Sequence, residues 1–122
     1  MRLSVFYAGL ILMSGILMVP VSSDLTARFL DVGEGNAVLL QSENKTMLID
    51  CGTEEYGNLT RVYLKSLGIE FLDIVMITSP AQGNTGGLMN IMNSTPVGCY
   101  YHGGWDSTDP AYRDLLARLH EN

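Results

Sequence analysis

Residues 74–88 read IVMITSPAQGNTGGL, and this stretch decides how the rest of the chain is interpreted. Residues 74–77 are fully apolar and predict a short strand. The following segment is rich in Gly, Ser, Pro and Asn, which predicts a loop. Leu88, Ile91 and Met92 then begin a short helix that Pro96 ends. A strand that leads through a loop into a helix is typical of a layered fold of sheet and helices.

Three strands are expected upstream of this stretch, at residues 26–32, 37–41 and 46–49. The Gly- and Asn-containing segment 33–36 predicts a turn between the first two, because both residue types tolerate positive φ. A polar link at residues 42–45 joins the second strand to the third. Because both connections are short, we expect these three strands to be antiparallel.

Two more helices and one more strand complete the predicted elements. The first helix carries apolar residues at helical spacing, namely Leu59, Val62, Tyr63 and Leu67. Gly68 is a natural stop for it. Residues 97–101 predict a strand, and residues 112–119 predict a helix that Asp109-Pro110 would start as N-cap and first helical residue.

The order of these elements predicts the fold class. Strands joined through helices are usually parallel neighbours with right-handed crossovers. The sequence therefore predicts an α/β domain of the layered α+β kind, with a mixed β-sheet covered by helices. Ligands bind beyond the carboxyl ends of strands in such sheets. The loops expected there are residues 31–36, 50–57 and 78–87.

The N-terminal residues differ from the rest of the chain. Residues 1–23 combine a basic start at Arg2, an apolar run and a small-residue exit, which predicts a signal peptide or, alternatively, a membrane anchor. Residues 24–122 are then one extracytoplasmic domain, secreted or anchored. The net charge of −6 argues against binding to a nucleic-acid backbone. Cys51 and Cys99 are expected to be free, because one strand would separate them by roughly 9–10 Å.

Several motifs in order resemble one branch of the metallo-β-lactamase superfamily, which includes the C-terminal domain of the DNA-uptake protein ComEC and exported free-standing relatives. The motifs that carry the resemblance are residues 29–37, Leu48-Ile49-Asp50-Cys51-Gly52, residues 63–69, Ile74-Val75-Met76-Ile77-Thr78, Gly86-Gly87-Leu88 and residues 112–116. The family usually has Gln and Asp where this chain has Glu34 and Asn36. The resemblance implies an incomplete, N-terminal part of that fold.

In that family, the loop after Thr78 carries a His-x-His-x-Asp-His pattern that holds zinc, and the metal activates water for hydrolysis. The corresponding positions here are Ser79, Ala81, Gly83 and Asn84. Ala81 and Gly83 have no side-chain donor, and the other two are weak, neutral zinc ligands. The sequence therefore predicts a degenerate metal loop, with neither metal-binding nor catalytic residues and no cofactor.

Asp50 and Asp31 are the residual candidates at the edge of that site. The resemblance matches Asp50 to a family carboxylate beside the metal, whereas an ordinary turn role would have it bond nearby backbone amides. An all-oxygen site for calcium is a further alternative, with the ligands Asp31, Glu34, Asp50, Glu54 and Glu55. Residues 83–87 offer a second alternative, a backbone cradle for an anion.

Three functions from different classes remain open at this stage. The first is a non-catalytic binding or interaction module, with an unidentified protein partner or self-association through an uncovered sheet edge. The second is a metal-dependent hydrolase, nuclease- or phosphodiesterase-like, as the resemblance implies. The third is a fragment of a split or truncated gene. An aromatic group is a candidate partner surface or a cap on the sheet edge, and consists of Tyr100, Tyr101, Trp105 and Tyr112.

Overall fold

A computed structural model describes residues 24–121 of the chain. The predicted signal peptide or anchor, residues 1–23, lies outside the described residues. Within residues 24–121, no helix is long and apolar enough to cross a membrane.

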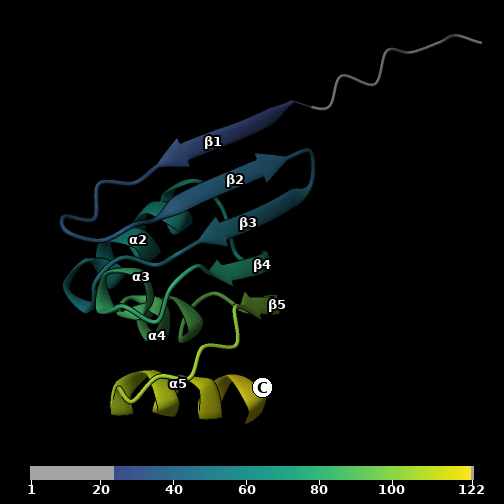
Figure 1. Cartoon of the computed structure of the whole chain (residues 1–122). Coiled ribbons are helices and arrows are strands. Elements are labelled where there is room, and N and C mark those ends of the chain that lie inside the picture. The colour runs from purple at the N-terminus through teal and green to yellow at the C-terminus, as the bar shows by residue number, and fades with distance from the viewer. Residues whose placement is uncertain (1–23, 122) are drawn as a thin grey trace, which may run out of the picture.

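The centre of the structure is a five-stranded sheet whose strands lie side by side in chain order (Figure 1). The strands are β1 (Leu25–Phe29), β2 (Val38–Ser42), β3 (Lys45–Ile49), β4 (Leu72–Ile77) and β5 (Val97–His102). The pairs β1–β2 and β2–β3 are antiparallel, whereas β3–β4 and β4–β5 are parallel. The predicted mixed sheet and its strand directions are confirmed.

Strand β1 is shorter at its end than the sequence predicted, because it stops at Phe29 instead of residue 32. The chain already turns at Asp31, whose Oδ1 accepts a hydrogen bond from the backbone N–H of Gly33 at 3.4 Å. Gly33 has φ +65, a conformation that suits glycine. The link between β2 and β3 is also tight, and Glu43 takes φ +50 there.

The helices are α2 (Glu54–Ser66), α3 (Gln82–Thr85), α4 (Leu88–Met92) and α5 (Pro110–Glu121). Helix α2 ends as expected, since Gly68 has φ +71 and donates its N–H to Lys65. Helix α5 also starts as expected: Asp109 Oδ1 accepts from the N–H of Ala111 at 2.9 Å. Two details were wrong: α2 begins inside the expected loop 50–57, and α3 lies inside the expected loop 78–87.

The hydrophobic core lies between one face of the sheet and the helices (Figure 1). Leu39, Leu48 and Val75 pair across three neighbouring strands and are fully buried. Their partners in the core come from α2, α4 and α5, and include Leu64, Leu88, Ile91, Tyr112 and Leu115. Three helices therefore cover the same face of the sheet.

The opposite face of the sheet is apolar, and no helix within residues 24–121 covers it. Side chains alternate between faces along a strand, so two cross-strand rows of paired residues point away from the core. We call these rows the uncovered face; they are Phe29, Val38, Ile49, Met76 and Tyr101, and Ala27, Leu40, Met47, Ile74 and Cys99. None of these side chains is buried, and none is charged.

The packing predicts a large difference between two leucine truncations. Leu48→Ala should lower the free energy of unfolding by about 2–5 kcal/mol, because it opens a cavity in the centre of the core. Leu59→Ala in α2 is the matched control, since Leu59 is 54 % exposed. Urea unfolding followed by circular dichroism measures both, and an equal cost for the two would contradict this assignment of the core.

Candidate functional site

Three loops meet beyond the ends of β1, β3 and β4, as the sequence predicted. The N–H of Asn36 donates to the carbonyl of Gly83 at 2.9 Å, and the N–H of Gly52 donates to the carbonyl of Asn36 at 2.8 Å. The N–H of Cys51 donates to the carbonyl of Asn84 at 2.8 Å. These backbone bonds hold the loops at residues 31–36, 50–53 and 78–87 as one unit.

Glycines make this close approach possible. A Cβ on Gly87 would lie 2.2 Å from the carbonyl oxygen of Cys51, and one on Gly35 would lie 2.4 Å from that of Gly83. Both distances are far below van der Waals contact, so a side chain at either position would push the loops apart. The glycine motif therefore has a packing role that needs no ligand.

The interpretation of residues 83–87 as an anion cradle is wrong. The N–H groups of Asn84 and Thr85 both donate to the carbonyl of Ala81, at 2.9 and 3.1 Å. Those of Gly86 and Gly87 donate to the carbonyls of Gln82 and Gly52. Because the turn of α3 and the neighbouring loop at Gly52 take up these donors, they are not directed at a ligand.

Asp50 is the centre of a buried hydrogen-bond network in this loop cluster. Its side chain is 3 % exposed, and its Oδ1 accepts from the N–H of Thr78 at 2.8 Å. Its Oδ2 accepts from Thr78 Oγ1 at 2.6 Å and from Asn84 Nδ2 at 2.7 Å. Asn84 Nδ2 also donates to Thr78 Oγ1 at 3.0 Å. The carboxylate thus ties the end of β3 to the loop that follows β4.

This network differs from the turn role that the sequence suggested for Asp50. The residue does occupy a turn conformation, with φ +58. Its side chain, however, bonds to residues 28 and 34 positions further along the chain. Only the parallel pairing of β3 with β4 brings these partners together, so sequence spacing did not indicate them.

The four positions that the resemblance matches to zinc ligands do not fit a zinc ion. Ala81 and Gly83 carry no donor, and Ser79 Oγ accepts a hydrogen bond from the N–H of Ala81 at 3.2 Å. Asn84 is 8 % exposed and directs its amide nitrogen at Asp50. An amide nitrogen is a hydrogen-bond donor with no lone pair to offer a metal. Asp50, the one carboxylate among these residues, is already bonded by Thr78 and Asn84.

The structure does not bring the carboxylates of the calcium alternative together. Asp31 lies on an exposed loop, where its carboxylate accepts only the local bond from Gly33. Glu34, Glu54 and Glu55 are exposed as well. Across the described residues, no three His, Cys, Asp or Glu side chains are close enough to share a metal ion. A hard cation needs about six oxygen ligands, and the loop cluster does not gather them.

The two cysteines are free and lie in different environments. Cys51 is fully buried beneath the loop cluster, whereas Cys99 lies exposed on the uncovered face. Burial is the main cause that raises the pKa of the Cys51 thiol far above its ordinary value, and the negative charge of Asp50 raises it further. Cys51 is therefore a small buried apolar residue and not a nucleophile.

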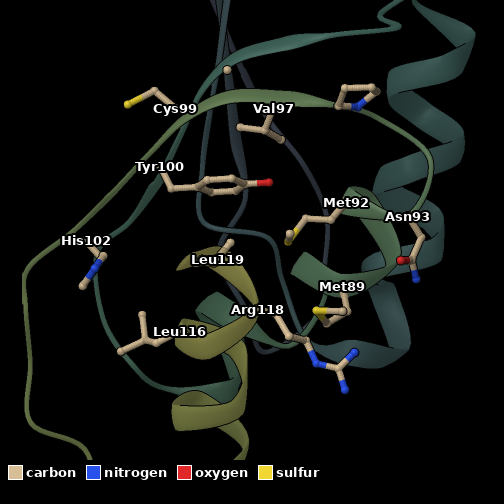
Figure 2. Close-up of a pocket in the computed structure, with 12 residues that line it drawn as sticks. Met89, Met92, Asn93, Val97, Cys99, Tyr100, His102, Leu116, Arg118 and Leu119 are labelled. Carbon is tan, nitrogen blue, oxygen red and sulfur yellow. The ribbon is translucent and has the colours of Figure 1, made fainter. Parts of the chain in front are cut away.

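A second concave region, an open pocket of about 830 Å³, lies between α4, β5 and α5 (Figure 2). Its wall combines apolar side chains, which include Met89, Met92, Leu116 and Leu119, with the polar side chains of Asn93, His102 and Arg118. Tyr100 points into this space, and Cys99 points away from it. The sequence analysis missed this pocket, although Met89 and Met92, spaced by three residues, are a signal of an apolar helix face.

The aromatic group does not form one surface. Tyr112 is buried in the core, and Trp105 packs over Gly103 and against the core. Tyr100 lies on the helix side of β5, whereas Tyr101 lies on the uncovered face and is 52 % exposed. Only Tyr101 is therefore available to a partner of that face.

Comparison of the chain with models of known families, with curated proteins and with solved structures finds no match. The resemblance to the metallo-β-lactamase superfamily therefore remains a prediction from the sequence motifs.

The substitution Asp50→Asn tests the network at nearly constant shape. Asn tolerates the positive φ of this position, but its NH₂ group would face donors from Thr78 or Asn84. We expect the free energy of unfolding to fall by about 1–3 kcal/mol. Urea titration measures it, with Asp31→Asn as the control because that carboxylate is exposed. Equal stability of the Asp50→Asn variant and the unsubstituted protein would rule out the network.

The buried thiol predicts an alkaline loss of stability. The pKa of Cys51 is raised in the folded state, whereas in the unfolded chain it is about 8.5. Below that pH, the protonated thiol contributes fully to the free energy of unfolding. As the pH rises above the unfolded pKa, this contribution falls by about 1.4 kcal/mol per pH unit. Urea unfolding of a Cys99→Ser variant at pH 7 to 9.5 measures the decline. Adding Cys51→Ala should remove the share of the decline that the buried thiol causes. A decline of unchanged size would show that other groups cause it.

Proposed function

We propose that this chain is an exported domain of the metallo-β-lactamase type that has lost its zinc ligands and serves as a non-catalytic binding or interaction module. The proposal combines the motif resemblance with the chemistry of the loop cluster. No hydrolytic step is assigned to any residue of the chain.

The hydrogen bond from Asn84 Nδ2 to Asp50 Oδ2, 2.7 Å long, is the observation that carries this proposal. At the position where the family has a histidine, this chain has an amide that donates to the neighbouring carboxylate. A zinc ligand would instead offer a lone pair to the metal. The site positions are thus occupied by a stable structural network, which supports a scaffold role for the former metal end of the sheet.

The uncovered face supports the second half of the proposal, the interaction role. Contiguous apolar surface on a soluble protein commonly marks a site of contact with another molecule. This face lies on the sheet itself, away from the loop cluster, so binding there would not depend on a metal.

The same face also favours the alternative that the chain is one piece of a split domain, since such a piece would expose the surface on which its other piece packs. Co-expression separates this alternative from the proposal. A second polypeptide encoded next to this gene, which co-purifies in a one-to-one ratio and brings histidine ligands with it, would support the split domain.

Metal analysis and a hydrolysis assay test the proposal against the hydrolase alternative. The full-length protein, produced with added zinc and dialysed, should contain well below one zinc per chain by mass spectrometry. It should not cleave bis(p-nitrophenyl) phosphate above the buffer rate. His102→Ala is the control for incidental binding, because His102 is exposed. Stoichiometric zinc that survives this substitution, together with phosphodiesterase activity, would contradict the proposal.

A further inference from the structure

The uncovered face is a feature of the molecule that the loop cluster does not explain. It runs across all five strands without a charged or buried side chain. Its exposed large side chains are Phe29 and Tyr101, with exposed fractions of 81 % and 52 %, and Leu25 beside them on β1 is 67 % exposed. The sequence analysis expected an uncovered edge, whereas the structure leaves a whole face open.

An apolar face of this kind is normally covered. Sheets in proteins bury an apolar face against another layer, which is a helix layer or a second sheet. On the core side of this sheet, α2, α4 and α5 provide that layer. Within the described residues, nothing provides it on the other side, so the free-energy gain from burial is still available to a binding partner.

We propose that the uncovered face is the interface of a homodimer, in which two copies of this chain pack sheet against sheet. This names the partner of the interaction module proposed above and rests on that function for its biological meaning. Two sheets packed in this way lie about 10 Å apart, with their strands about 30° from parallel, and their side chains interdigitate. A two-fold axis brings the same face of both copies together.

The distribution of charge fits a second copy. The chain has a net charge of −6, so contact between two copies costs least where charge is absent from the interface. The charged neighbours of the uncovered face are turned to other groups: Arg28 lies on the core side and bonds to Gln41, and Lys45 pairs with Asp73. No like charges are therefore forced together in the middle of the interface.

The available area also suffices. A fully buried aromatic side chain removes about 150–250 Å², so Phe29 and Tyr101 at their present exposure each offer on the order of 100 Å² or more. With the aliphatic members, each copy presents on the order of 600 Å², or roughly 1,200 Å² for the pair. This is the lower bound of a specific, stable interface, and its apolar character is that of homodimers.

The mass of the protein in solution tests the proposal. The full-length chain is expressed and exported, and the N-terminus of the accumulated form is read by mass spectrometry. Sedimentation velocity should give the mass of two chains. Phe29→Glu and Tyr101→Glu should each give the mass of one, because they place like charges at the interface. Both side chains are largely exposed in the single chain, so circular dichroism should be unchanged.

Val62→Glu is the matched control, because Val62 is 49 % exposed on α2 and away from the uncovered face. It adds the same charge and should leave the dimer intact. Cys99 gives an independent readout, since it lies on the uncovered face. Its alkylation should be several-fold faster in the Phe29→Glu variant than in the unsubstituted protein.

Four results would overturn the dimer. They are a single-chain mass for the unsubstituted protein, a dimer that survives Phe29→Glu, loss of the dimer in Val62→Glu, and purification with a different polypeptide. A single chain in which retained residues 1–23 protect Cys99 would assign the face to that apolar segment instead. Zinc-dependent hydrolysis would contradict only the proposed function. The mass from sedimentation velocity would still decide whether the chain is a dimer.

Discussion

The structure depends on a sheet that is apolar on both faces, and in the described part of the chain helices pack on only one of them. Burial of Leu39, Leu48 and Val75 against α2, α4 and α5 stabilises the domain. It also fixes which side chains point away, because residues alternate between faces along each strand. The strand pairing that builds the core therefore also leaves apolar side chains on the opposite face. The proposed dimer would bury them.

The loop cluster shows a different constraint, the requirement that buried polar groups be paired. Asp50 is nearly inaccessible to water, so its two oxygens need donors, and Thr78 and Asn84 supply them. This network, together with the close glycine contacts, explains the shape of the cluster without a bound group. The loops where the resemblance implies chemistry are here a structural joint between β3 and β4.

Much of the fold followed from local patterns. Strand and helix periods, the Gly68 stop and the Asp109 cap predicted the elements and their directions, because these signals act within a few residues. The errors occurred where residues that are distant in the sequence determine the local structure. Loop 78–87 contains α3 because its amides and glycines pack against residues 51–57, and β1 stops early because the chain turns toward the same cluster. The pocket beside α4 joins elements that sequence spacing does not connect.

The sequence by itself determined the order of strands and helices, and it showed that Ser79, Ala81, Gly83 and Asn84 carry neither imidazole nor carboxylate groups. Side-chain chemistry and periodicity are properties of the residues themselves. The tertiary structure alone decided the partners of Asp50 and the open face of the sheet. An apolar strand indicates that both its faces avoid water, but not what covers them. That depends on which segments pack together, and in this chain α2, α4 and α5 all pack on one side.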